Sequence, residues 1–303
     1  MSAAIIFGLL LALMLTGMPI SISLGLTVLT FLFTMTQVPI ESVALKLFTG
    51  IEKFEIMAIP FFILAGNFLT HGGVAKRMIN FATAMVGHWH GGLGLGGVVA
   101  CALFAAVSGS SPATVVAIGS IIIPAMVKQG FPRNFGAGVI ASSGGLGILI
   151  PPSIVMVMYA VSTNSSIGAR FIAGVIPGLM LAAMLFGTTY YIARKNNYPR
   201  MPRASWAERA KAFKDSIWGL LLIVIVIGGI YTGLFTATEA AAMSAVYAFV
   251  IAVFVYKDMP LRGVPKVLLS SANMSAMLLY IITNAVLFSF LLTSENIPHA
   301  IAE

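Results

Sequence analysis

The stretch Ala106-Val-Ser-Gly-Ser-Ser-Pro-Ala-Thr114 decides the fold of this 303-residue chain. It lies inside a run, residues 91–127, that contains no Asp, Glu, Lys or Arg. A long uncharged run is typical of a segment embedded in a membrane, but glycine and proline disfavour a continuous helix through its centre. Non-helical backbone at membrane depth is tolerated only where protein covers it or a polar cavity adjoins it. The stretch therefore predicts a functional break in a membrane helix.

A second stretch of the same character follows at Ser142-Ser-Gly-Gly-Leu-Gly-Ile-Leu-Ile-Pro-Pro-Ser153. Transporters use two broken helices to hold an ion and a small solute near the middle of the bilayer. Each half of the first run has about 15–17 residues, or roughly 22–26 Å of helix, against a hydrocarbon core of about 30 Å. We therefore predict a re-entrant helical hairpin over 93–128, followed by a transmembrane helix over 134–163 that is broken at 144–152.

Composition identifies the chain as an all-α polytopic membrane protein. Hydrophobic residues make up 59% of it and charged residues only 9%, whereas a soluble domain carries roughly 25% charged residues. The single cysteine, Cys101, excludes an internal disulfide, and no cofactor or metal cluster is expected. Apolar runs predict helices at about 3–17, 19–37, 56–70, 171–193, 216–235, 237–256 and 274–293.

The basic residues predict an orientation in the bilayer. Seven of the seventeen Lys and Arg residues fall in the segment 194–215, which is typical of a cytoplasmic loop beside anionic lipid. This placement puts the N-terminus and residues 38–55 on the outer side of the membrane. The net charge of +8 is spread along membrane loops and forms no patch that would fit a duplex, so no nucleic-acid partner is expected.

Three pairs of short motifs indicate an internal repeat. Leu15-Thr-Gly-Met-Pro-Ile20 is echoed by Tyr231-Thr-Gly-Leu-Phe-Thr236, and Val38-Pro-Ile40 by Met259-Pro-Leu261. The segment 62–70 loosely matches 285–293, and the three separations range from 216 to 223 residues. In the orientation above the two copies run in opposite directions, as in inverted-repeat transporters. A second hairpin at this separation would begin beyond Glu303, so we expect the sequence to be truncated at its C-terminus.

The residues at the two breaks offer neutral oxygen atoms. Ser108, Ser110, Ser111 and Thr114 carry hydroxyls, and the two prolines of the second break would free main-chain oxygens around 148–150. No Asp or Glu occurs from Ile56 to Ala207. The set therefore suits Na⁺ better than Ca²⁺ or a proton relay, and helix N-termini after each break would attract an anionic substrate. The alternative is that Ser, Thr and Gly simply allow tight helix packing.

Three polar residues elsewhere in the apolar segments have local explanations. Asn67 would bond either the hairpin or its own helix neighbours, and Glu239 would mark the start of a helix. Arg170 is expected to anchor a helix at the membrane interface, and a role with an anionic substrate stays open.

The motifs Ser108-Gly-Ser-Ser-Pro-Ala-Thr114 and Gly147-Ile-Leu-Ile-Pro-Pro-Ser153 resemble the large membrane subunit of tripartite ATP-independent periplasmic (TRAP) transporters. The segments 15–20, 59–66 and 232–240 are similar to the same family, and the resemblance covers the whole chain. It implies a sodium-coupled importer of an organic acid, such as a C4-dicarboxylate or sialic acid, and not an enzyme. It also implies a small membrane subunit and a periplasmic binding protein as partners, in the bacterial inner membrane.

The resemblance further implies an elevator mechanism in which a mobile part moves against a fixed scaffold. On this basis we divide the chain into scaffold helices and an arm (1–92), a transport part (93–193), a basic cytoplasmic loop (194–215) and the incomplete scaffold of the second repeat (216–303). The sodium ligands implied by the resemblance are Ser108, Ser110, Gly144, Gly147, Ile150 and Pro152. Candidates for contact with the substrate at the hairpin tip are Ser111, Thr114, Gly145 and Ser153.

Two alternative functional classes make different demands on the sequence. A related sodium–dicarboxylate carrier would work without a binding protein. Residues 38–55 would dock a binding protein only in a TRAP transporter. A membrane-embedded hydrolase would need a serine–base dyad or metal ligands, and the sequence near the breaks provides no acid or paired histidine for either.

Overall fold

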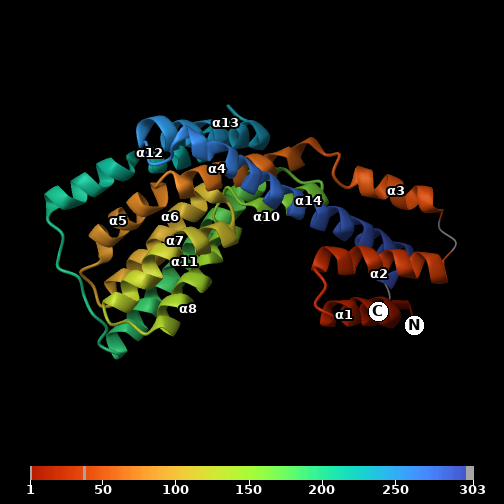
Figure 1. The fold of residues 1–303 in the computed structure, drawn as a ribbon, viewed down its shortest axis with the longest axis horizontal. Helices are drawn as coiled ribbons and strands as arrows, with labels where there is room; N and C mark the ends of the chain where they lie inside the picture. The colour runs from red at the N-terminus through yellow and green to blue at the C-terminus, as the bar shows by residue number, and fades with distance from the viewer. Residues whose placement is uncertain (1, 37–38, 298–303) are drawn as a thin grey trace. The chain divides into compact units, whose positions relative to one another are not determined.

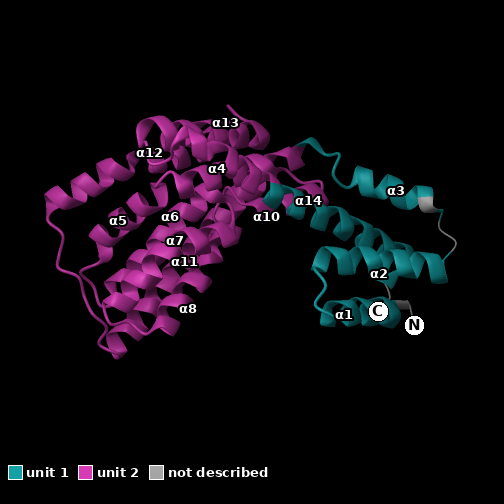
Figure 2. Cartoon of the chain, in the orientation of Figure 1, with its two compact units in different colours: residues 1–54, 273–303 teal, residues 55–272 magenta. Residues whose placement is uncertain are grey.

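The structure is a computed structural model that describes residues 2–36 and 39–297. Over these residues every regular element is a helix and no strand occurs (Figure 1). Contacts divide the chain into two compact units, residues 1–54 with 273–303 and residues 55–272 (Figure 2). The all-α class predicted from composition is confirmed.

In the described part of the chain, six helical segments are long and apolar enough to cross a membrane. They are Phe54–His71, Ser111–Lys128, Ile167–Lys195, Trp206–Tyr231, Ala237–Val255 and Leu261–Ser294. A further pair, Arg133–Leu149 and Ile154–Ser162, passes the same test together but bends by 41°. The polytopic membrane class follows from this number of spans.

The first unit contains α1 (Ser2–Leu15), α2 (Ile20–Met35), α3 (Ile40–Thr49) and the later part of α14 (Val264–Ser294). Its core is made of apolar side chains from these helices and the segment after α14: Ile6, Val28, Phe31, Leu32, Val43, Leu287, Leu291 and Ile297. Gly25 of α2 leaves room for the buried amide of Asn284, which donates to the Tyr280 carbonyl at 2.9 Å. A polar side chain is thus satisfied inside an apolar bundle.

The second unit contains most of η1 (Phe54–Met57), α4 (Ala58–His71), α5 (Val74–Val86) and the helices of the two breaks. It also contains the helices from α11 to η3 and the start of α14. Here α4 packs on α13 (Ala237–Val250), and α5 packs on both α6 (Gly92–Ser108) and α12 (Trp206–Tyr231). The rings of Phe68 and Phe249 meet edge to face at 5.4 Å between α4 and α13. The α5–α6 pair in turn supports the hairpin described below.

The structure contains more helix than hydropathy alone predicts. Helices α3 and α5 were not expected, because each carries charged residues on one face and lacks a long apolar run. The helices α11 (Ile167–Lys195), α12 and α14 extend into stretches assigned to loops, so the connection within 194–215 shortens to 196–205. A capping box formed by Ser205 and Glu208 starts α12 within the segment predicted to be a loop.

The backbone supports the internal repeat at two of the three motif pairs. Gly17 after α1 and Gly233 after α12 both adopt left-handed conformations, with φ of 84° and 74°. Pro39 and Pro260 both precede a helix in extended conformation, with φ, ψ of −63°, 141° and −70°, 149°. Val38 of the second pair lies outside the described residues. In the third pair both segments lie inside helices, 62–70 in α4 and 285–293 in α14, so no turn can be compared.

The paired glycine turns give a test of local backbone strain. Both Gly233 and Gly187 (in α11) have no neighbouring atom within 4 Å of the position that a Cβ would take, but only Gly233 has a positive φ. We expect Gly233→Ala to lower the free energy of unfolding by about 1 kcal/mol, because an L-residue is disfavoured in this conformation. Gly187→Ala should leave it unchanged or raise it by up to about 1 kcal/mol, because alanine favours a helix.

Thermal unfolding of both variants in detergent checks this expectation. Equal melting temperatures for Gly233→Ala and Gly187→Ala would contradict it, since steric clash is absent at both positions.

Candidate functional site

The first predicted break is present. Helix α6 ends at Ser108 and α7 begins at Ser111, with Gly109 in a left-handed conformation (φ 61°) and Ser110 extended (φ −130°, ψ 119°) between them. The two helices pack against each other, so the pair forms a helical hairpin with its tip at the break (Figure 1). That this hairpin enters and leaves the membrane on one side stays a prediction.

The second predicted break is present and has an additional element inside it. Helix α8 (Arg133–Gly144) gives way to the single turn α9 (Leu146–Leu149), and α10 (Ile154–Ser162) follows. Between α9 and α10 the chain is non-helical, with Ile150 and Ser153 both in extended conformation. The sequence predicted the limits of this break but not the turn of helix within it.

The two breaks touch each other through main-chain atoms. The Ile154 N–H, at the start of α10, donates to the Gly109 carbonyl at the hairpin tip with a separation of 3.0 Å. A Cβ on Gly109 would lie 2.6 Å from the Pro152 carbonyl oxygen, and a Cβ on Gly147 would lie 2.8 Å from the Ser111 nitrogen. Real Cβ atoms do not approach so closely, so glycine is required at both contacts.

The hairpin tip contains a short chain of buried hydroxyls. Ser108 and Thr114 are both fully buried, and their hydroxyl oxygens lie 3.1 Å apart. Thr114 also donates its hydroxyl to the Ser110 carbonyl at 2.9 Å. Because a threonine hydroxyl has one proton, Ser108 must donate to Thr114 in this arrangement. The Ser108 oxygen keeps its lone pairs for a further partner.

Several main-chain oxygens at the breaks accept no backbone hydrogen bond from any residue in the described ranges. They belong to the end of α6 and to the end of the second break: Ala106, Val107, Ser108, Leu149, Ile150, Pro151 and Pro152. One expectation is corrected here, because the Ile148 carbonyl is not free. The buried Ser153 hydroxyl donates to it at 2.7 Å and closes the turn that precedes α10.

The structure brings most of the predicted site residues together, with one exception. Gly144 lies against Val115 and the Ser111 carbonyl of α7, and Gly147 lies against Ser110 and Ser111. Gly145 sits at the bend between α8 and α9, where a Cβ would meet only the Ser142 carbonyl and no atom of the hairpin.

Ile150 is held in place by α11. Its side chain packs against Gly178, and the neighbouring Leu149 carbonyl lies against Gly174. These two glycines are four residues apart on α11 and let that helix approach the second break closely. Sequence reasoning missed both, although a Gly-x-x-x-Gly spacing in an apolar helix is a recognisable signal.

Two further residues at the site were also missed. Gly66 of α4 lies against the Cβ of Ser108, so α4 covers the hairpin tip. The Ser143 hydroxyl, one residue before the end of α8, is fully buried and has no hydrogen-bond partner among the described residues. Burying a hydroxyl without a partner costs free energy, so Ser143 is a further candidate for contact with a ligand at this site.

The structure gives contacts for Asn67, Glu239 and Arg170, the three polar residues within apolar segments. The Asn67 amide donates to Ser271 of α14 at 2.7 Å, so neither alternative weighed for it holds. Glu239 forms a capping box with Thr236 at the start of α13, as expected. Arg170 donates to Ser165 and lies over the ring of Tyr159 at 4.8 Å, which leaves its role with a substrate untested.

The electrostatics of the site come from uncharged groups. No cluster of three His, Cys, Asp or Glu residues that could hold a metal occurs in the described part of the chain. The C-terminal end of α6 presents carbonyl oxygens, and the N-terminal ends of α7 and α10 lie close to each other across the Gly109–Ser153 contact. Helix ends of both signs therefore meet in one small region.

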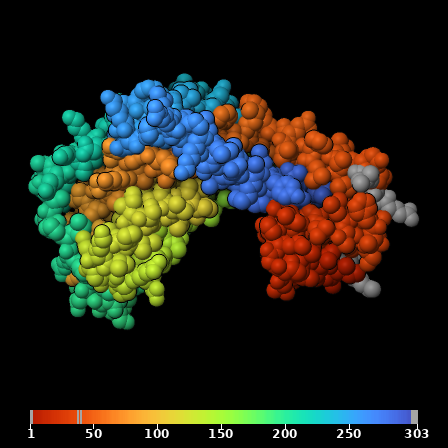
Figure 3. Space-filling view, in the orientation of Figure 1, coloured from red at the N-terminus to blue at the C-terminus, as the bar shows by residue number. Residues whose placement is uncertain are grey.

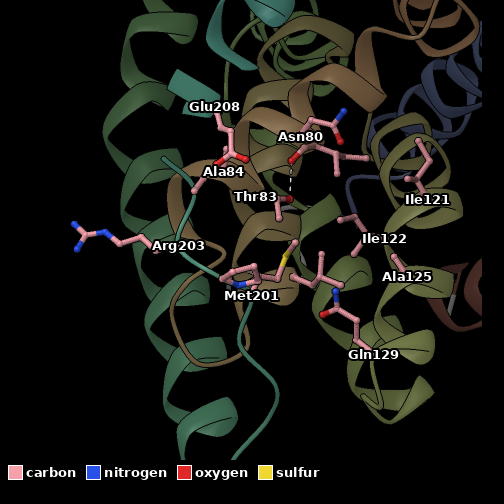
Figure 4. Close-up of a pocket in the computed structure, with 14 residues that line it drawn as sticks. Asn80, Thr83, Ala84, Ile121, Ile122, Ala125, Gln129, Met201, Arg203 and Glu208 are labelled. Atoms are coloured by element: carbon pink, nitrogen blue, oxygen red, sulfur yellow. Dashed lines mark hydrogen bonds between the residues drawn. The ribbon is translucent and has the colours of Figure 1, made fainter. Parts of the chain in front are cut away.

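One cavity lies apart from both breaks. It has a volume of about 570 Å³ and opens between α5, the start of α6, the end of α7 and the segment 201–208. Figure 4 shows Asn80, Thr83 and Gln129 around it, with the Arg203 side chain directed away from it. None of the predicted site residues lines this cavity, so it is not the predicted ion site.

Several membrane-spanning helices with two adjoining breaks define a multi-pass transporter subunit. Comparison of sequences establishes the family: the chain belongs to the family described as "Tripartite ATP-independent periplasmic transporter, DctM component", whose profile matches residues 7–303. The resemblance noted from the sequence motifs is confirmed. Because the relatives are named as transporter permeases, this is a transporter and not an enzyme.

The chain is similar to several curated members of this family. It is 76% identical to the C4-dicarboxylate TRAP transporter large permease protein DctM of Rhodobacter capsulatus, over 100% of this chain and 72% of that protein. It is 48% identical to the protein of the same name from Vibrio cholerae, over 100% of this chain and 72% of that protein. It is 37% identical to the sialic acid TRAP transporter large permease protein SiaM of Vibrio cholerae, over 97% of this chain and 69% of that protein.

The contact between the breaks can be tested with one methyl group. We expect Gly147→Ala to lower the free energy of unfolding by about 1–3 kcal/mol, because its Cβ would meet the Ser110–Ser111 backbone, which cannot move aside freely. Gly138→Ala, in α8, is the matched control, since no atom lies within 4 Å of its Cβ position.

Thermal unfolding of the two variants in detergent measures the difference. A Gly147→Ala protein as stable as Gly138→Ala would show that the two breaks do not pack as closely as described.

Proposed function

We propose that this chain imports a C4-dicarboxylate across the bacterial inner membrane by symport with Na⁺. The observation that carries the proposal is the main-chain contact between the two helix breaks at Gly109–Ile154 and Gly147–Ser111. The substrate class is supported by relatives at 76% and 48% identity that are named for C4-dicarboxylates, whereas the sialic acid relative is more distant, at 37%.

The proposed sodium site uses oxygens from both breaks. Ser108 and Ser110 supply oxygens from the hairpin, and Gly144, Gly147, Ile150 and Pro152 supply main-chain oxygens from the second break. The carbonyls of Ser108, Ile150 and Pro152 accept no backbone hydrogen bond, which leaves them available to a cation. The absence of Asp and Glu from 56–207 favours a monovalent ion, because Ca²⁺ sites usually include carboxylates.

The proposed substrate site lies beside the ion site. The N-termini of α7 and α10 carry partial positive charge and lie next to each other, which suits a carboxylate group. Ser111 is partly exposed at the hairpin tip, whereas Thr114 and Ser153 are fully buried. Gly145 is placed away from the tip and contributes least to this proposal.

Partners and motion follow from the family. We propose that a small membrane subunit and a periplasmic binding protein complete the system, with the N-terminus periplasmic and the segment 194–215 cytoplasmic. An elevator movement would carry the broken helices, within 93–193, against a scaffold formed by 3–70 and 216–293. The two compact units do not follow these boundaries, so the assignment of moving and fixed parts remains part of the proposal.

The sodium site is tested by removing one hydroxyl. We expect Ser110→Ala to raise the Na⁺ concentration needed for half-maximal uptake by roughly tenfold, because losing one ligand oxygen to a charged group costs about 1.5 kcal/mol. The measurement is uptake of radiolabelled succinate into proteoliposomes that contain the chain with its partner subunit and binding protein. Ser120→Ala, an exposed serine on the same helix, is the control.

A sodium activation curve that is identical in Ser110→Ala and Ser120→Ala would remove Ser110 from the ion site. Uptake that needs no sodium gradient in the unmodified protein would overturn the coupling itself.

The same proteoliposomes separate the proposal from its alternative. We expect succinate uptake to require the periplasmic binding protein. Full uptake without it would favour a sodium–dicarboxylate carrier of related fold that collects its substrate directly from solution.

A further inference from the structure

The basic segment after α11 is fastened to the short connection between α5 and α6. The Met201 N–H donates to the Gly87 carbonyl at 3.0 Å, and the Gly91 N–H donates to the Pro199 carbonyl at 3.3 Å. The sequence His88-Trp89-His90 lies between these two attachments. Its place beside basic side chains is therefore fixed by main-chain hydrogen bonds.

Four arginines surround the two histidines. Arg200 hydrogen-bonds His90 Nε2 through its Nη2, and Arg194 and Arg200 line one cavity with both histidines. The charges of Arg203 and Arg209 act on His88. Partial burial lowers the pKa of both histidines, and the nearby guanidinium charges lower each pKa further. Among the described residues none of the four arginines forms a salt bridge with a carboxylate. The cluster thus has an excess of positive charge and no anion of its own.

Several hydrogen-bond donors of this cluster lack acceptors. The Trp89 indole N–H donates to His88 Nε2 at 2.9 Å, so the His88 proton must be on Nδ1. That Nδ1 is buried and bonds to nothing in the described structure, and the same holds for Nε and Nη2 of Arg209. Three buried donor nitrogens without an acceptor suit a ligand with several acceptor oxygens.

Aromatic rings adjoin the cluster on the side of α11. A cavity of about 550 Å³ is lined by His88, Trp89, His90, Tyr190, Arg194 and Arg200. The Trp89 ring meets the rings of Phe186 and Tyr190 edge to face, each at 5.7 Å, and is 43% exposed. Tryptophan and tyrosine beside basic residues at the end of an apolar helix are typical of the membrane–water interface.

From this arrangement we infer that the His88–His90 segment, with Arg194, Arg200, Arg203 and Arg209, binds the phosphodiester of an anionic membrane phospholipid. The phosphate oxygens accept from the arginines and from His88. The acyl chains lie along the aromatic and apolar face of α11, whose most apolar 18-residue stretch is only 17% buried. The segment 196–214 is open along one edge of its unit, so a lipid can reach it (Figure 3).

A lipid source is favoured over a free phosphate ion by the surroundings. A soluble ion would need only the charged groups, whereas here the cavity continues onto exposed aromatic rings at the end of a membrane-spanning helix. The cavity lies in a different part of the unit from the two breaks, and it shares no residue with the proposed sodium and substrate sites. This inference does not depend on the proposed transport function.

Native mass spectrometry of the detergent-solubilised full chain, titrated with phosphatidylglycerol or phosphatidylcholine, tests the inference. We expect phosphatidylglycerol to bind at least about tenfold more tightly, and Arg194→Gln/Arg200→Gln to reduce that affinity by about tenfold or more. Lys128→Gln/Arg133→Gln removes two exposed basic residues that do not line the cavity and should change the affinity less than twofold. A photocrosslinking residue in place of Tyr190 should attach phosphatidylglycerol to the peptide that contains it.

Each other outcome overturns the inference. Equal binding of the two lipids, or an unchanged affinity in Arg194→Gln/Arg200→Gln, would show that the cluster does not recognise an anionic headgroup. Displacement of phosphatidylglycerol by millimolar inorganic phosphate would identify a free-phosphate site instead. Matching melting temperatures of the two double variants show that loss of binding is not loss of fold.

Discussion

The structure depends on the close approach of two stretches of main chain at the helix breaks. Gly109 meets Pro152, and Gly147 meets Ser110 and Ser111, at distances that allow no side chain between them. The surrounding helices maintain this approach: α4 reaches Ser108 through Gly66, and α11 reaches Ile150 through Gly178. Glycine therefore serves here as the residue that lets peptide groups come together.

The same constraint explains why the site needs no charged side chain. In a membrane, a carbonyl oxygen that accepts no hydrogen bond costs free energy unless some other partner is present. The oxygens at the end of α6 and around Ile150 are in this state, and the helix dipole of α6 adds negative potential at Ser108. A small cation would satisfy these oxygens, and no Asp or Glu occurs from Ile56 to Ala207 that could bind the cation in their place.

Much of the fold could be predicted because composition and helix-breaking residues are local signals. The positions of both breaks followed from Gly, Ser and Pro within apolar runs, and the class followed from the low content of charge. Helices α3 and α5 were missed because their charged faces break the apolar pattern, although tertiary packing holds them in place. The start of α12 was misplaced, although Ser205 and Glu208 carry a recognisable capping signal.

The contacts of the site were harder to predict, because they join residues far apart in the sequence. Nothing local indicates that Asn67 would bond Ser271, or that Gly66 would lie against Ser108. The Ser153–Ile148 hydrogen bond depends on the geometry of a turn that hydropathy does not encode. The lone Ser143 hydroxyl stands out only when burial and bonding are known for each atom.

The directions of the hydroxyl bonds at the breaks have a consequence for selectivity. Ser108, Thr114 and Ser153 each point their single proton at a neighbouring oxygen of the protein. Toward a bound ion or substrate, these three hydroxyl oxygens can therefore act only as acceptors. These oxygens would attract a metal cation and repel a carboxylate. A carboxylate would have to accept its hydrogen bonds from peptide N–H groups or from Ser111. The directions of these hydroxyl protons thus separate the region that suits a cation from the region that suits an anion.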